Sequence, residues 1–372
     1  MKFIHWGKHI MTNTAKTPHP ATAGHSERNI SFDLIRILAI FLVMYNHRET
    51  YIFYHHVPHM GLRYILSMCG AAFCKCGPPL FFMVSGALIL HKKESFRKIF
   101  QHRILRILIV MVIVSILMVT LIPDSDPFFK TFFSGLNWYL YAYVGFLLML
   151  PFLRILVNHM TKKDMKMFFI LTAIAYSVSE ILIPFTSAVE AFTGFMPIFS
   201  SPFGSSCWNL VFPILAYCLI SFSKHEEDPT RKKRILLVLL LGTIASLIIA
   251  MLLMNYDLTA NHGEYLELIA QHAILFPCCF VFYGLYEGFS GRSIRLLFSG
   301  KVLAELSAAT FGMFLIETHT SFSRQIFEFV ASWFPHAAGP YLCSLVSIVL
   351  QLLLYFLVIF ALRRIPPLRK IL

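Results

Sequence analysis

Charged residues are scarce in this sequence, and acidic residues are the scarcest among them. Only 14% of the residues are charged, and 19 acidic residues stand against 32 Lys and Arg. Soluble domains average about 25% charged residues, so the composition excludes an ordinary soluble domain. The hydrophobic share of 57% and the mean hydropathy of +0.69 are instead typical of a polytopic membrane protein.

Several motifs of soluble enzymes are also missing. The sequence has no glycine-rich phosphate loop, no Gly-x-Ser-x-Gly nucleophile elbow and no internal repeat. Its eight cysteines lack the ligand number and spacing of a zinc site, so we expect no metal. Residues 1–29 lack the apolar core of a secretory signal peptide. We expect this stretch to be a disordered cytoplasmic tail.

Hydrophobic segments of about membrane-spanning length fill the rest of the chain. They predict an all-α fold: a polytopic integral membrane helical bundle of about ten transmembrane helices. This domain is expected over residues 30–365, followed by a cytoplasmic tail over 366–372. The ten segments lie at residues 30–48, 69–90, 105–122, 137–157, 167–185, 207–223, 235–254, 267–287, 302–321 and 341–362.

The surplus of basic residues has a topological explanation. With the N-terminus inside, 26 Lys and Arg fall in the N-terminal tail, the even-numbered loops and the C-terminus, and five fall on the opposite side. Arg36 lies in the inner part of the first segment. Positive residues mark the cytoplasmic side, so both termini are expected in the cytoplasm. The membrane itself is expected to be the plasma or inner membrane. The net charge of +13 therefore indicates topology in a lipid bilayer, not nucleic-acid binding.

The first hydrophobic segment carries three ionisable residues, Asp33, Arg36 and His47. Each costs roughly 2.5–3.5 kcal/mol at membrane depth, so such groups usually face a protein interior or a polar cavity. Asp33 and Arg36 are three residues apart and close enough to pair. Arg36 and His47 are about three helical turns apart, on the same face and roughly 16 Å along the axis. This pattern fits either a stabilising ion pair with an interfacial histidine or a functional site.

The second segment contains two consecutive prolines, Pro78 and Pro79. Because proline is tolerated at the start of a helix but not inside it, we expect a regular helix from Pro78 and irregular backbone over residues 69–77. Such backbone is tolerated where it lines a cavity, so Lys75 is expected either in an outward-facing cavity or at the interface. Ser85 and Gly86 are expected to let this helix approach the first.

Three further positions carry candidate functions. Arg103 and Arg106 are three residues apart on the cytoplasmic side, where they either reflect positive-inside bias or bind a phosphate, for which arginine is well suited. Trp138 fits an aromatic belt at the membrane interface, with sugar stacking as a second reading. Glu317 is costly in an apolar helix, and we expect it to pair with His47 or with Arg36.

These elements resemble the membrane acyltransferase 3 family, integral enzymes that O-acylate cell-surface glycans with acyl groups from acyl-CoA. The resemblance covers the first four helices well and the ninth in part. In the ninth helix the family's terminal histidine falls on Glu317, while His319 follows two residues later. The motifs that carry it are D-x-I-R-x-L-A-I-x-x-V-x-x-x-H from Asp33 to His47, F-F-M-V-S-G at 81–86, R-I-L-R at 103–106 and N-W-Y-L at 137–140.

The resemblance implies an O-acyltransferase that moves an acyl group, most often acetyl, from cytoplasmic acyl-CoA to a hydroxyl of a glycan or of its lipid-linked precursor. Acyl-CoA is a substrate, and no bound cofactor is expected. Arg103 and Arg106 would hold its phosphates. His47 would act as general base, with Arg36 and Asp33 positioning the donor or the helix. A transient acyl group on His47 remains an open variant.

Lys75 is one candidate for stabilising the developing oxyanion. An alternative function is a transporter or exporter of a glycan or small metabolite, since embedded charges and a broken helix suit that task as well. The absence of an inverted repeat speaks against it. The loop at 54–59 carries three histidines and is expected to be solvated, and the loop at 186–206 is expected to cover the outer face.

Overall fold

The computed structural model describes residues 29–53, 61–121, 126–185, 207–226, 228–289, 300–319, 322–333 and 339–371. Within these ranges the regular secondary structure is helical and no strand occurs, in agreement with the predicted all-α class. The expected tail at 1–28, the histidine-containing loop at 54–59 and the long loop at 186–206 lie outside the described residues.

A change of helix type occurs at three places in the described part of the chain. A π-helical turn, Phe100–Ile104, joins α4 to α5, and 3₁₀ turns precede α7 and follow α8. The α-helices are α1 (Ile30–Phe53), α2 (Leu62–Cys74), α3 (Gly77–Ile89), α4 (Phe96–Ile99), α5 (Leu105–Leu121), α6 (Phe128–Phe132), α7 (Trp138–His159), α8 (Lys162–Leu182), α11 (Trp208–His225), α12 (Pro229–Ala260), α13 (Leu266–His272), α14 (Leu275–Phe289), α15 (Gly300–His319), α16 (Phe322–Trp333), α17 (Gly339–Leu362) and α18 (Pro366–Ile371).

The described helices fit a helical membrane protein. Seven helical stretches in the described part of the chain are long and apolar enough to cross a bilayer, and the pair α13–α14, bent by 42°, raises the number to eight. Each of the ten predicted segments coincides with a helix or, at 69–90 and 267–287, with a pair of helices, but α11 is shorter than a full span and α15 is not among those that qualify. The count of ten and the cytoplasmic termini therefore stay predictions.

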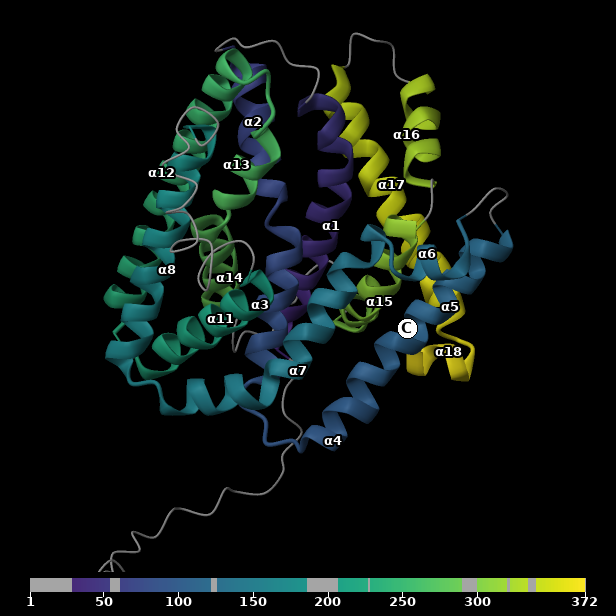
Figure 1. The fold of residues 1–372 in the computed structure, drawn as a ribbon, viewed down its shortest axis with the longest axis horizontal. Helices are drawn as coiled ribbons and strands as arrows, with labels where there is room; N and C mark the ends of the chain where they lie inside the picture. Colours follow the sequence, from purple (N-terminus) through teal and green to yellow (C-terminus); the bar gives the residue numbers. More distant parts are fainter. Residues whose placement is uncertain are drawn as a thin grey trace, which may run out of the picture.

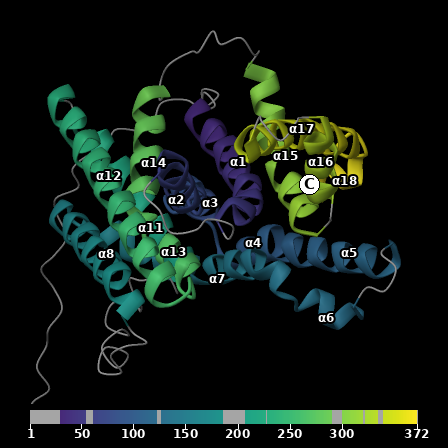
Figure 2. The ribbon, with the colours of Figure 1, turned by 90° about the horizontal axis from the view of Figure 1, so that it is seen from above.

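The first helix is enclosed by the others. In Figures 1 and 2, α1 and α3 lie in the middle of the molecule, with α8, α11, α12, α13 and α14 on one side and α15, α16 and α17 on the other. Helix α1 packs against α2, α3, α14, α15 and α17. Asp33 is thereby buried in protein, and Arg36 and His47 are partly covered by it, in keeping with the cost of ionisable groups at membrane depth.

The break between α2 and α3 is shorter than predicted. Residues 69–74 form the end of α2, and only Lys75 and Cys76 separate the two helices; the expectation of irregular backbone over 69–77 was wrong. Pro78 and Pro79 lie in the first turn of α3, where a missing N–H breaks no helical hydrogen bond. Helix α2 therefore stays regular up to Cys74, and the break is confined to two residues.

Gly86 brings α3 close to α11, not to α1 as the sequence suggested. A Cβ atom at Gly86 would lie 2.4 Å from the Cα and carbonyl oxygen of Pro213 in α11. The approach to α1 depends on Gly77, where a Cβ atom would lie 3.0 Å from the carbonyl oxygen of Ala39. Small residues permit such close helix contacts, but only the tertiary arrangement decides which helix each one faces.

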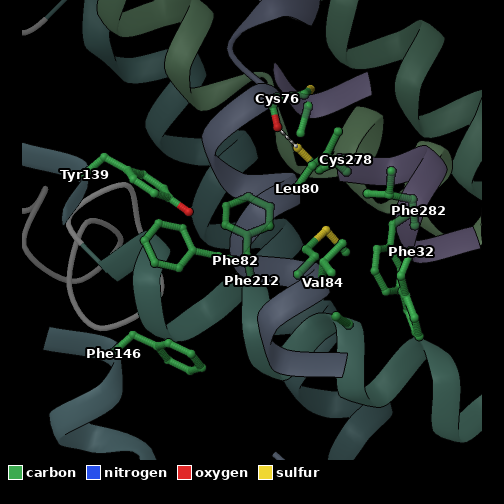
Figure 3. Packing of buried hydrophobic residues seen from close by; sticks show 14 of the residues in the cluster. Phe32, Cys76, Leu80, Phe82, Val84, Tyr139, Phe146, Phe212, Cys278 and Phe282 are labelled. Atoms are coloured by element: carbon green, nitrogen blue, oxygen red, sulfur yellow. Dashed lines mark hydrogen bonds between the residues drawn. The ribbon is translucent and has the colours of Figure 1, made fainter. Parts of the chain in front are cut away.

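Aromatic side chains dominate the buried core between α3, α7, α11 and α14 (Figure 3). Phe82, Phe146, Phe212 and Phe282 are fully buried, and Tyr139 is nearly so. The Phe82 ring lies edge-on to Phe146 and 5.1 Å from Tyr139 between centroids. Such rings bury large apolar areas in defined geometries, so this core fixes how α3 and α7 present the residues of the site.

Candidate functional site

Two cavities share the same four helices, α1, α3, α7 and α15. The inner cavity has a volume of about 540 Å³ and is lined on α1 by Arg36. The outer cavity has a volume of about 780 Å³ and is lined on α1 by His47, three turns further along. The names inner and outer follow the predicted topology. The helix stripe that carries Arg36 and His47 thus opens into a cavity at each level.

His47 and Glu317 form a close pair at the outer cavity. The Nδ1 atom of His47 lies 2.7 Å from Oε1 of Glu317, which reaches it from α15. The Glu317 side chain is fully buried, whereas that of His47 is 37% exposed and lines the cavity. When Nδ1 carries the ring proton it donates to the carboxylate, and Nε2 is left as a base. His47 is one of the two partners predicted for Glu317.

Arg36 faces the inner cavity, and its contacts include Asp33 and Ser307. Its Nη1 atom lies 3.6 Å from Oδ1 of Asp33, as the spacing of three residues predicted, and 3.5 Å from Oγ of Ser307 on α15. Asp33 is buried, and the Arg36 side chain keeps 31% of its surface exposed. A buried carboxylate therefore anchors one side of the guanidinium, and the rest of it borders the cavity.

Basic side chains gather around the inner cavity from three successive elements besides α1, namely α4, the π-helical turn and α5. Arg103 and Arg106 both line it, together with Lys98 and His102, and Glu94 is the acidic residue among the lining side chains. Arg103 belongs to the π-helical turn Phe100–Ile104, which no feature of the sequence predicted. Such turns are frequent at functional sites. The predicted pair of arginines is brought to one cavity, whose lining is strongly positive.

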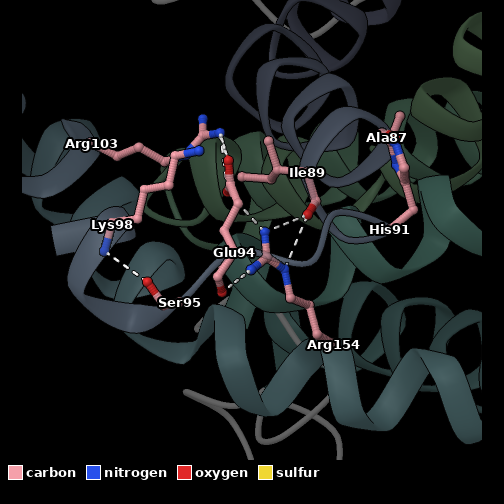
Figure 4. Close-up of polar contacts among 8 residues, drawn as sticks. All are labelled: Ala87, Ile89, His91, Glu94, Ser95, Lys98, Arg103 and Arg154. Carbon is pink, nitrogen blue, oxygen red and sulfur yellow. Dashed lines mark hydrogen bonds and ion pairs between the residues drawn. The ribbon is translucent and has the colours of Figure 1, made fainter. Parts of the chain in front are cut away.

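Glu94 ties this cation cluster to α7, as Figure 4 shows. Its carboxylate oxygens accept hydrogen bonds from Arg103 at 3.1 and 3.3 Å and from Arg154 at 3.1 Å. Arg154 is buried and also donates to the carbonyl oxygen of Ile89. Burial raises the pKa of Glu94, but the bonds from the two arginines outweigh it and hold the pKa below its ordinary value.

Polar and aromatic side chains cover the remaining wall of the outer cavity. Lys75 lines it, as predicted, with its Nζ atom 3.0 Å from Glu267. Trp138 and Trp208 also line it, with ring centroids 6.1 Å apart and planes at 80°. Asn209 and Gln271 add amide groups. Because the two indoles come from α7 and α11, the sequence showed only Trp138 and gave no reason to place Trp208 beside it.

Two further predictions concern residues near the cavities. Ser85 lines the inner cavity and donates a hydrogen bond to the Tyr143 hydroxyl oxygen at 3.2 Å, a polar role in addition to the packing role expected of it. His319 points elsewhere than Glu317: it is buried, with Nε2 3.0 Å from Oδ1 of Asn137. In the described ranges, no three His, Cys, Asp or Glu side chains are close enough together to hold a metal ion.

The structure thus separates the predicted residues into two groups. Asp33, Arg36, Ser85, Arg103 and Arg106 belong to the inner cavity or its border, and His47, Lys75, Trp138 and Glu317 belong to the outer one. Tyr143, Arg154, Trp208 and Ser307 were not predicted, because no local motif marks them. Each gains its place only through contacts between helices distant in the sequence.

The comparisons with known proteins agree with this geometry. The model of the acyltransferase 3 family, described as an acyltransferase domain, matches residues 29–363, nearly the whole chain. Neither the curated proteins nor the solved structures include a significant match. A buried carboxylate against a histidine and a cationic cavity, on a helical membrane fold, suit the transfer of an acyl group. The chain belongs to the acyltransferase 3 family and is a membrane acyltransferase.

Proposed function

We propose that this protein transfers an acyl group, most often acetyl, from acyl-CoA in the inner cavity to a hydroxyl of a glycan, or of its lipid-linked precursor, in the outer cavity. The observation that carries the proposal is the His47–Glu317 pair. It supplies an oriented base at one cavity, while the same four helices supply a cationic cavity at the other. The enzyme would act in the cell membrane.

The inner cavity supports the donor assignment through its charge. Arg103 and Arg106 line it on the predicted cytoplasmic side, together with Arg36. Arginine forks bind phosphate oxygens with charge-assisted hydrogen bonds, and CoA carries a diphosphate and a 3′-phosphate. The pantetheine arm is an extended chain, so it could reach inward past Arg36 while the phosphates stay at the mouth.

The outer cavity supports the acceptor assignment through its mixed lining. Indole faces from Trp138 and Trp208 stand beside the amides of Asn209 and Gln271. Aromatic faces pack on the apolar faces of sugar rings, and amides match sugar hydroxyls. The wall therefore has the chemistry of a carbohydrate site, open to the outer side in the predicted topology.

The proposed reaction is a single acyl transfer. The acceptor hydroxyl gives its proton to Nε2 of His47 as its oxygen attacks the thioester carbonyl, and Glu317 stabilises the imidazolium. The C–O bond forms, the C–S bond breaks, and the proton on His47 passes to the departing CoA thiolate. The Lys75 ammonium, though paired with Glu267, is the cation available in the outer cavity for the developing oxyanion.

A test with purified protein in lipid nanodiscs would measure thiol release from acetyl-CoA and label transfer from [¹⁴C]acetyl-CoA to surface glycan. The wild type should perform both, and His47→Ala should lose transfer. His159→Ala, an exposed histidine at the end of α7, is the matched control. Transport of a glycan or metabolite without thioester cleavage would favour the alternative function, and transfer by His47→Ala would exclude His47 as the base.

A further inference from the structure

Three aromatic side chains form a partition between the two cavities: Phe82 of α3, Tyr139 of α7 and Phe314 of α15. Phe314 lines both cavities, Tyr139 lines the inner one and Phe82 the outer one. Ring centroids are 5.0 Å apart for Tyr139 and Phe314 and 5.1 Å apart for Tyr139 and Phe82. Figure 3 shows the Tyr139 and Phe82 side chains near each other within the core, and their ring planes are tilted by 50°.

The partition is one side chain thick at Phe314, which lines both cavities. On α3, Phe81 lines the inner cavity and its neighbour Phe82 the outer one. On α7 the same alternation places Tyr139 inside and Trp138 outside. Consecutive residues of a helix point about 100° apart, so each helix contributes one ring to each side at the same level. The inner and outer cavities therefore approach each other at this level, where Phe314 lines both of them.

The donor-binding and base residues line different cavities, so transfer would take place at the partition between them. The arginines that would hold CoA line the inner cavity, and the His47–Glu317 pair lines the outer one. An acceptor hydroxyl bound to His47 can reach a thioester only where the two cavities meet. The acyl group must then lie against Phe314, which lines both cavities, and against Tyr139; the two rings are buried, at 5% and 7% exposed.

We propose that the partition of Phe82, Tyr139 and Phe314 holds the acyl group during transfer and selects a short, uncharged one, with Phe314 as the main determinant. This inference rests on the proposed function and deepens it. The three rings pack against one another, so a longer acyl chain would have to displace them. Displacing side chains in a close-packed interior costs free energy. None of the three side chains is charged, so a carboxylate at the end of an acyl chain would be buried without a partner. Acetyl is accordingly favoured over hexanoyl and over succinyl.

The test compares kcat/KM for acetyl-, butyryl-, hexanoyl- and succinyl-CoA, measured by thiol release from protein in nanodiscs. The variants are Phe314→Ala and Phe314→Leu; the leucine variant keeps an apolar side chain and carries the test if the alanine variant does not fold. One added methylene changes discrimination in an apolar pocket by about 10–200-fold. We therefore expect the hexanoyl-to-acetyl ratio to rise at least tenfold in both variants, while succinyl-CoA stays a poor donor and affinity for free CoA is unchanged.

Phe311→Ala is the matched control, because Phe311 lies on the same helix one turn away and lines only the inner cavity. It should shift the ratio much less than Phe314→Ala. An unchanged chain-length preference in both Phe314 variants, or an equal shift in Phe311→Ala, would overturn the inference while leaving acyl transfer intact. Failure of the proposed function looks different: the wild type itself would neither bind acyl-CoA nor cleave its thioester.

Discussion

Replacing Glu317 with glutamine gives the sharpest test of the pair that carries the proposed chemistry. Glu317→Gln keeps the size of the side chain and can still accept a hydrogen bond from Nδ1 of His47. It removes only the negative charge, which lies 2.7 Å from the imidazole in the wild type. The fully buried Glu317 side chain is poorly screened, so its charge should act mainly on the imidazolium that forms as His47 accepts a proton.

The size of the effect follows from this contact. Two unit charges about 4 Å apart attract by about 4 kcal/mol at an effective dielectric constant of about 20. Since about 1.36 kcal/mol corresponds to a factor of ten in rate, losing the attraction should lower kcat by up to about 10³-fold. Solvent at the exposed side of His47 makes this an upper bound. Affinity for acyl-CoA should stay the same, because its proposed contacts lie in the inner cavity.

Steady-state transfer from acetyl-CoA to the glycan acceptor measures kcat and KM for this comparison. Glu305→Gln is the matched control: Glu305 lies on the same helix and pairs with Arg363, but its side chain is 48% exposed. The control should keep nearly wild-type kcat. A Glu317→Gln enzyme with kcat within a factor of three of wild type would refute the role of the buried charge.

The double variant separates a chemical role from a structural one. His47→Ala leaves the Glu317 carboxylate buried without its partner, and an uncompensated buried charge costs about 3–5 kcal/mol. Thermal stability should therefore fall in His47→Ala and recover in His47→Ala/Glu317→Gln. Activity should not recover, and the two losses should not add, because residues that act as a unit are non-additive. Activity losses that multiply would show two independent roles.

Three other changes have expected outcomes. Arg103→Ala with Arg106→Ala should weaken CoA binding by about 10²-fold or more in calorimetry, since charge-assisted hydrogen bonds contribute about 1.5–3 kcal/mol each. Gly86→Ala should lower stability in thermal unfolding by about 1–3 kcal/mol, because its Cβ would meet the backbone of Pro213 at 2.4 Å. Glu94→Gln should lower the melting temperature at neutral pH. Because the pKa of Glu94 is lowered in the folded protein, the difference in melting temperature from wild type should persist above about pH 5. It should shrink as the pH falls through that lowered pKa.

Each of these has a control of the same kind. Lys163→Ala, an exposed change at the start of α8, should leave CoA binding intact; equal weakening would make the arginine effect a general loss of charge. Gly135→Ala meets nothing within 4 Å and should be tolerated. For Glu94, a melting difference that grows on acidification would contradict the sign of its pKa shift.

Local spacing was enough to predict much of the site. Residues on one helix at a separation of three or eleven must share a face whatever surrounds the helix, so the Asp33–Arg36 contact and the common stripe of Arg36 and His47 followed from the sequence. The prolines marked the start of α3, because their effect on backbone hydrogen bonding is also local. The prediction that residues 69–77 before them are irregular was wrong, because proline constrains only its nearest neighbours.

Contacts between helices lay beyond the sequence. Gly86 was expected against α1 but faces Pro213 in α11, because composition shows that a position is small and not which neighbour uses the space. Glu317 had two possible partners, and only the placement of α15 beside α1 settled the contact in favour of His47. Trp208 carries no motif, yet packing of α11 on α7 sets it beside Trp138.

The sequence by itself determined a membrane-spanning helical chain, the family to which it belongs and the ionisable residues that its helices carry. These depend on hydropathy, motif and helical periodicity, which are properties of neighbours along the chain. Only the tertiary structure decided that the ionisable residues divide between two cavities and that Phe82, Tyr139 and Phe314 stand between them. Those features depend on how rings from α3, α7 and α15 interlock, and close packing between distant segments is set by the whole fold at once.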